Sequence, residues 1–97
     1  YFETIKKISE ENNFKVIVAI FPVYLDLDNY QFKDVHNFVN NAALEYGFYT
    51  IDLFDYYKAY NDEDLIVNRD DRHPNELAHE LAANAIYGLM ISNRISL

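Results

Sequence analysis

The stretch that decides the fold is Lys15-Val16-Ile17-Val18-Ala19-Ile20-Phe21, and it is followed directly by Pro22. Its apolar side chains follow one another without alternation, which predicts a strand covered on both faces, as in a parallel sheet. Proline cannot donate a hydrogen bond to a central strand, so Pro22 marks the end of this one. The sequence therefore predicts a buried β-strand over residues 15–21.

The residues after this strand complete a βαβ unit. A helix is predicted over residues 31–46, because apolar residues recur there at intervals of three and four: Val35, Phe38, Val39, Ala42, Ala43 and Tyr46. His36 falls outside this stripe and is predicted to lie on the surface. Gly47 stands at the C-terminal cap, where glycine adopts a positive φ cheaply. A second strand is predicted over residues 48–53, and the helical crossover makes its pairing with the first strand parallel.

Further helices are predicted over residues 1–12, 54–60 and 76–91. A polar turn is expected at residues 61–64, and Leu65-Ile66-Val67 is expected to attach the following loop to the core. Asp52 and Asp55 fall near the C-terminal end of the second strand, where capping of the next helix explains one of them. The pattern as a whole predicts an α/β fold.

Composition narrows the class of protein. The 97 residues allow one small domain, and 51% hydrophobic content with nine Tyr and seven Phe indicates a globular chain. A net charge of −8 argues against a nucleic-acid surface, which needs a basic patch. The absence of cysteine excludes disulfides and thiolate catalysis. No apolar run approaches the roughly 18 residues of a membrane span.

The chain begins at Tyr1 without an initiator methionine, in a segment typical of the middle of a helix. We therefore expect residues 1–97 to be a piece of a longer protein, and the compartment stays open. Two buried strands without further neighbours would leave apolar faces uncovered. We accordingly expect the isolated chain to associate with the rest of its parent protein or with itself.

One polar stretch combines acids, an imidazole and a rigid backbone: Asp70-Asp71-Arg72-His73-Pro74-Asn75. Proline suits the first turn of a helix, so His73 is predicted at the boundary between a loop and the helix over residues 76–91. A carboxylate bonded to one ring nitrogen would orient the imidazole as a general base. Asp70 is the predicted partner and Asp71 its competitor. A helix cap beside a surface histidine explains the same pattern equally well.

The segment from Asp70 to His79, with the alanine-rich helix behind it, resembles the last conserved block of the SGNH/GDSL hydrolases. The two predicted strands and the helix between them also resemble that family's penultimate strand, crossover helix and last strand. The resemblance implies a three-layer α/β/α sandwich with a parallel, flavodoxin-like sheet, of which residues 1–97 form the C-terminal βαβ-α portion. It implies a serine esterase, lipase or carbohydrate O-deacetylase that needs no cofactor or metal. His73 would be the general base and Asp70 the third triad member.

Two departures from the family pattern stand out. Ala78 replaces the usual glycine, which is a mild change. The Gly-Asp-Ser block of the nucleophile is missing, and Ser9, Ser92 and Ser96 do not lie in a strand-to-helix turn. The chain by itself is therefore expected to be inactive, since acyl transfer needs a nucleophile, a base and an oxyanion hole together.

Tyr24 and Asn75 are the candidate substrate-binding residues. Tyr24 falls in the loop after the first strand, where open α/β sheets bind ligands, although packing of that loop explains it as well. The expected substrate is a small-molecule or carbohydrate ester. His79 is predicted to lie on a helix surface or to pack, because its spacing from His73 does not suit a shared metal.

Other readings of the chain remain open. The acids at positions 26, 28 and 62–64 suggest calcium, but the glycine of an EF-hand loop is absent. A non-catalytic binding or assembly domain on the same fold is the main alternative function. A fragment of a flavodoxin-like or receiver domain shares the architecture but does not require the His-Pro-Asn turn.

Overall fold

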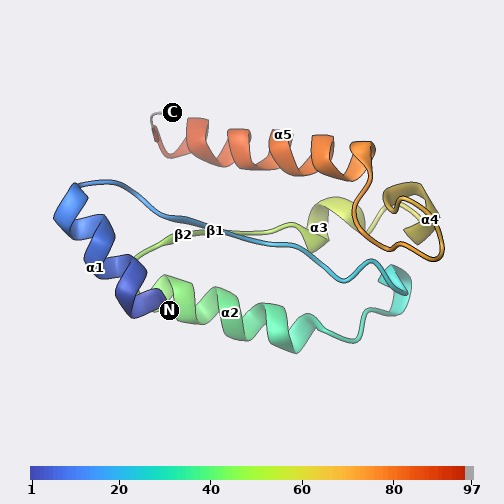
Figure 1. The fold of residues 1–97 in the computed structure, drawn as a ribbon, viewed down its shortest axis with the longest axis horizontal. Helices are drawn as coiled ribbons and strands as arrows, with labels where there is room; N and C mark the ends of the chain where they lie inside the picture. Colours follow the sequence, from blue (N-terminus) through green and yellow to red (C-terminus); the bar gives the residue numbers. More distant parts are fainter. Residues whose placement is uncertain (96–97) are drawn as a thin grey trace.

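The computed structural model describes residues 1–95. Figure 1 shows the order of the elements, which are α1 (Phe2–Asn12), β1 (Ile17–Ile20), a 3₁₀ turn (Leu27–Asn29), α2 (Lys33–Glu45), β2 (Tyr49–Asp52), α3 (Phe54–Tyr57), α4 (Asp62–Leu65) and α5 (Glu76–Ser92). Among these residues no helix has the length and apolarity needed to cross a membrane.

β1 and β2 form a parallel pair in which Ile17 lies opposite Tyr49 and Ile20 opposite Asp52. The predicted βαβ unit is confirmed, with α2 as its crossover and Gly47 at a φ of 76° after the helix. Both strands are shorter than predicted because the ladder spans only this register.

The helices lie on both sides of the strand pair. Figure 1 shows α1 and α2 on one side and α5 on the other; α2 contacts both strands and α5 contacts β2. The fold is therefore mixed α/β with a small parallel sheet. The core contains Leu53, Tyr57 and Leu65, which are fully buried.

Close packing places α5 against this core. Its buried residues are Ala78, Ala82 and Ala85, whose small side chains allow a near approach. The Tyr57 hydroxyl donates a 2.6 Å hydrogen bond to the Ala78 carbonyl oxygen. Because that tyrosine is fully buried, the bond ties the first turn of α5 to α3.

The segment before α5 is fixed by backbone contacts. The Val67 N–H donates to the His73 carbonyl at 3.1 Å, and the Asn75 N–H donates to the Leu65 carbonyl at 2.9 Å. Ile66 and Pro74 form an antiparallel bridge. The turn that carries His73 is therefore a closed loop whose two ends are paired.

Three sequence predictions are wrong in detail. His36 is only 4% exposed, whereas Val35 and Phe38 of the predicted buried stripe are 57% and 75% exposed. Helix α2 is thus rotated about its axis relative to the prediction, because the His36 ring finds polar partners beside the sheet, while no described element covers the outer apolar residues.

The expected polar turn at residues 61–64 instead begins helix α4, where Asn61 and Asp64 form a capping box. Leu65 and Ile66 are buried as predicted, but Val67 is 55% exposed.

Candidate functional site

His73 lies in the turn directly before α5, with 86% of its side chain exposed. Its Nδ1 is 2.5 Å from Asp71 Oδ1, and its backbone N–H donates to the same oxygen at 3.1 Å. A carboxylate only accepts, so we assign the ring hydrogen to Nδ1, which leaves the Nε2 lone pair available. Within residues 1–95, Nε2 has no hydrogen-bond partner, and the imidazole is therefore arranged as a base.

The structure differs from the sequence expectation at the orienting carboxylate. The carboxylate that accepts the hydrogen bond from the His73 ring is that of Asp71 and not that of Asp70. The reason is the local turn, in which Asn68 Oδ1 accepts the N–H groups of Asp70 and Asp71 at 2.9 and 2.8 Å. This turn brings the Asp71 carboxylate to the His73 backbone and ring, an arrangement typical of an Asx-turn. A role for Asp70 stays a prediction.

The electrostatics of the pair follow from this contact. The hydrogen bond from the His73 side chain, aided by the one from its backbone N–H, lowers the pKa of Asp71 below its usual 3.8. Asp71 is therefore ionised throughout the pH range in which imidazoles ordinarily take up a proton. A carboxylate in this state stabilises the imidazolium that a general base becomes.

A cleft of about 420 Å³ opens beside His73. It lies between the loop after β1 and the turn before α5, and its lining residues are Phe21, Pro22, Val23, Tyr24, Arg72, His73, Pro74 and His79. The two sides are joined where Arg72 Nη1 donates to the Tyr24 carbonyl at 2.7 Å. Apart from Arg72 and the two imidazoles, the lining side chains are aliphatic or aromatic. The cleft thus offers an apolar surface next to a base.

The two predicted substrate-binding residues have different positions. Tyr24 lines the cleft but is only 3% exposed, and its ring packs edge-on against Tyr57 at 5.3 Å. Burial raises the pKa of its hydroxyl. Tyr24 is therefore mainly a core residue whose backbone and ring form part of the cleft wall.

Asn75 caps helix α5. Its Oδ1 accepts the Ala78 N–H at 3.0 Å, and its Nδ2 donates to the Asp64 and Ile66 carbonyls at 2.9 and 3.1 Å. Both amide hydrogens are thus used within the protein. A substrate-binding role for Asn75 would have to use its remaining oxygen lone pair or its surface.

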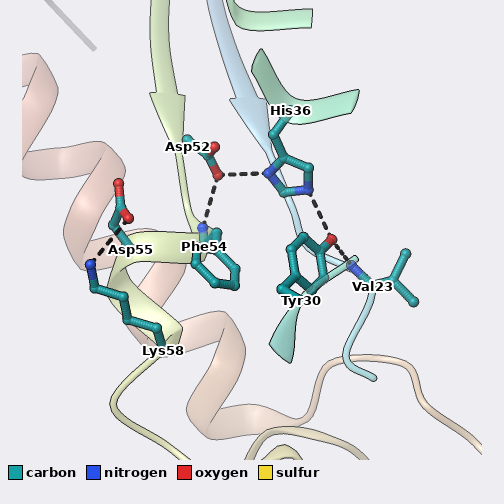
Figure 2. A network of polar contacts seen from close by, with 7 residues as sticks. All are labelled: Val23, Tyr30, His36, Asp52, Phe54, Asp55 and Lys58. Atoms are coloured by element: carbon teal, nitrogen blue, oxygen red, sulfur yellow. Dashed lines mark hydrogen bonds and ion pairs between the residues drawn. The ribbon is translucent and has the colours of Figure 1, made fainter. Parts of the chain in front are cut away.

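A second histidine–carboxylate pair was missed by sequence reasoning. Figure 2 shows His36 between Asp52 and Tyr30: Nδ1 lies 2.9 Å from Asp52 Oδ1, and Nε2 lies 2.9 Å from the Tyr30 hydroxyl. Asp52 Oδ1 also accepts the Phe54 N–H at 3.0 Å, although the N-cap residue of α3 is Leu53 and not Asp52. The topology could have indicated this pair: in a βαβ unit the helix begins at the same end of the sheet at which the next strand ends. His36, near the start of α2, and Asp52, the last residue of β2, both lie at that end of the sheet.

None of the described serines is a partner for His73. Ser9 lies in α1 and donates to the Lys6 carbonyl at 2.8 Å. Ser92 ends α5, which begins just after His73, so about 25 Å of helix separates them. Ser96 lies outside the described residues. Within residues 1–95, no three histidine or carboxylate side chains gather as metal ligands would.

No protein-family model, curated protein or solved structure that we compared with this chain matches it.

Proposed function

We propose that residues 1–97 supply the base of an SGNH/GDSL-type serine ester hydrolase, such as an esterase, lipase or carbohydrate O-deacetylase. The observation that carries this proposal is the Asp71–His73 hydrogen bond, which leaves Nε2 free beside the cleft. The resemblance of residues 70–79 to that family's last block supports it. The strand pair with helices on both sides is compatible with the C-terminal portion of a three-layer α/β/α sandwich.

In the proposed reaction, a serine from a segment outside residues 1–97 attacks the ester carbonyl. His73 Nε2 takes the serine proton and returns it to the departing alcohol. Water then attacks the acyl-enzyme carbonyl while His73 Nε2 takes a proton from it, and the same proton passes to the serine oxygen as the bond to the acyl group breaks and the acid is released. Asp71 holds Nδ1 throughout and stabilises the imidazolium.

The test is hydrolysis of p-nitrophenyl acetate by the intact protein, in which residues 1–97 are joined to the segment that would carry the serine. His73→Ala is expected to lower kcat by roughly 1000-fold or more, because the serine loses its base. Arg69→Ala, a change at an exposed neighbour in the same turn, is the matched control and should leave turnover unchanged. Equal turnover of His73→Ala and the parent would refute the assignment.

A non-catalytic binding or assembly domain is the second candidate. The observation that favours it is the high exposure of His73 together with the lack of a nearby serine within residues 1–95. A fluorophosphonate probe, which labels activated serines, separates the two candidates. Labelling of the intact protein that His73→Ala abolishes supports the hydrolase, and absence of labelling supports the binding domain.

A further inference from the structure

The hydrogen bonds around His36 determine where each proton of the network lies, from partly buried Asp52 to the exposed N–H of Val23 (Figure 2). Asp52 is an acceptor that already takes the Phe54 N–H, so His36 Nδ1 donates to it. The neutral ring then has a lone pair at Nε2, which accepts the Tyr30 hydroxyl. The Tyr30 oxygen in turn accepts the Val23 N–H at 2.8 Å. Every donor meets an acceptor only when His36 is neutral with its hydrogen on Nδ1.

A second proton on His36 would break this chain at Tyr30. Both ring nitrogens would then be donors. The Tyr30 oxygen would face two N–H groups, and its own hydrogen would lose its acceptor. The link from Tyr30 to Val23 therefore depends on the protonation state of His36.

Few charged groups surround the His36 ring. Asp52 of β2 is hydrogen-bonded to it, and the loop contributes the hydroxyl of Tyr30, whose pKa burial raises. Helix α2 also carries Lys33, 5.1 Å from the centre of the Phe54 ring, and the exposed residues Asp34 and Glu45. Asp55 of α3 pairs at 3.5 Å with Lys58, which follows that helix.

The network ends at a wall of the His73 cleft. Val23 and Tyr24 both line that cleft. The segment is held from one side by Tyr30 on the Val23 N–H and from the other by Arg72 on the Tyr24 carbonyl. Farther along, the Asp62 carboxylate accepts the N–H groups of residues 26 and 27 at 2.6 and 3.0 Å. Of these attachments, the one at Val23 is linked to a histidine.

We propose that His36 is a positioning residue for the His73 cleft. While neutral, it holds the Tyr30 hydroxyl on the Val23 N–H and so keeps one wall of the cleft in place. Once protonated, it releases this wall, and binding of a ligand in the cleft weakens. The inference rests on the proposed function insofar as an ester is the ligand that the cleft binds.

The kinetic test uses Tyr30→Phe in the intact protein, with p-nitrophenyl butyrate as the probe. The change removes the hydroxyl and keeps the ring, which stacks on Phe54 at 4.7 Å. KM should rise roughly fivefold, the effect of losing one ordinary hydrogen bond, while kcat is kept. The matched control is Tyr56→Phe, which removes a hydroxyl from an exposed tyrosine of α3 that does not line the cleft.

The pH profile separates positioning from simple structural support. In the parent protein KM should rise as the pH falls and His36 takes up its second proton. In Tyr30→Phe, KM should already be high and should no longer vary with pH. A parent KM that is flat with pH, or a Tyr30→Phe KM equal to that of Tyr56→Phe, would overturn the proposal.

Nitrogen-15 spectra of the histidine rings test the link between His36 and the cleft even if the protein hydrolyses no ester and the proposed function fails. Near neutral pH, His36 should show the neutral form with its hydrogen on Nδ1. The ring signals of His73 should shift in Tyr30→Phe and stay in place in Tyr56→Phe. A hydrogen on Nε2 of His36, or His73 signals unchanged in Tyr30→Phe, would contradict the inference.

Discussion

The described residues contain two histidine–carboxylate pairs, each joined from Nδ1 to Oδ1, that differ in sequence separation, in burial and in the contacts of Nε2. The Asp52–His36 pair joins residues 16 positions apart, and its imidazole is 5% exposed. The Asp71–His73 pair joins residues two positions apart, and its imidazole is 86% exposed. Both nitrogens of His36 have hydrogen-bond partners, whereas among residues 1–95 only Nδ1 of His73 has one. The first arrangement stabilises a fold, and the second leaves a lone pair for chemistry.

The comparison predicts its largest effect on stability at the buried pair. Asp52→Ala removes the acceptor of both the His36 ring and the Phe54 N–H, leaving two donors unpaired. The free energy of unfolding of the intact protein should fall by about 2–3 kcal/mol in urea titrations. Asp52→Asn keeps an acceptor oxygen and is the matched control, with a smaller loss.

At the exposed pair the same kind of truncation should cost little. His73→Ala should change the free energy of unfolding by no more than about 0.5 kcal/mol, because exposed pairs contribute little. A loss as large as that of Asp52→Ala would remove the distinction between the two pairs.

Alkaline pH should sharpen the contrast through Tyr30, the hydroxyl partner of His36. Burial raises the pKa of Tyr30 above its usual 10.0, and the same cause raises that of Tyr57. Their neutral forms stabilise the fold fully below pH 10, and this stability is lost as the pH rises through the raised values. The absorbance of tyrosinate should therefore appear at higher pH in the folded protein than in the unfolded chain. Tyr30→Phe should remove part of the absorbance change that occurs at the higher pH. Complete ionisation at the usual pH in the folded protein would contradict this.

The smallest expected effect on stability is that of Asp71 in acidic solution. Its lowered pKa means that its contribution is present above the usual 3.8 and is lost as the pH falls through the lowered value. A carbon-13 titration of the Asp71 carboxyl should have its midpoint below 3.8, and His73→Ala should move it towards the usual value, because only the backbone N–H of residue 73 then remains bonded to it. An unshifted midpoint in the parent protein would show that the hydrogen bond does not form in solution.

The sequence predicted the βαβ unit because strong local signals agreed: a continuous apolar run closed by Pro22 and a glycine after the helix. It failed for α2, where periodicity favoured Val35 and Phe38 for the buried face. Tertiary hydrogen bonds overrode that preference by drawing His36 inward. Hydrophobic periodicity carries no information on such bonds, since their partners come from other elements.

The sequence predicted that His73 lies at the boundary between a loop and the last helix, and the structure places it there, but the carboxylate bonded to its ring is not the one predicted. Asp70 and Asp71 are adjacent, so spacing alone does not tell which carboxylate reaches the ring. The choice depends on the turn that Asn68 closes with its side chain. Asn75 is of a residue type preferred at helix N-caps and directly precedes the predicted helix, so its capping role could have been predicted, although the pattern also suggested a ligand contact.

The most direct test of the central claim is the turnover of Asp71→Asn and Asp70→Asn, measured in the intact protein with p-nitrophenyl acetate. Each change keeps the shape of the side chain and removes its charge. If Asp71 holds His73 for catalysis, Asp71→Asn should lower kcat by roughly 100-fold, while Asp70→Asn stays close to the parent. The reverse order, with Asp70→Asn impaired and Asp71→Asn active, would contradict the claim.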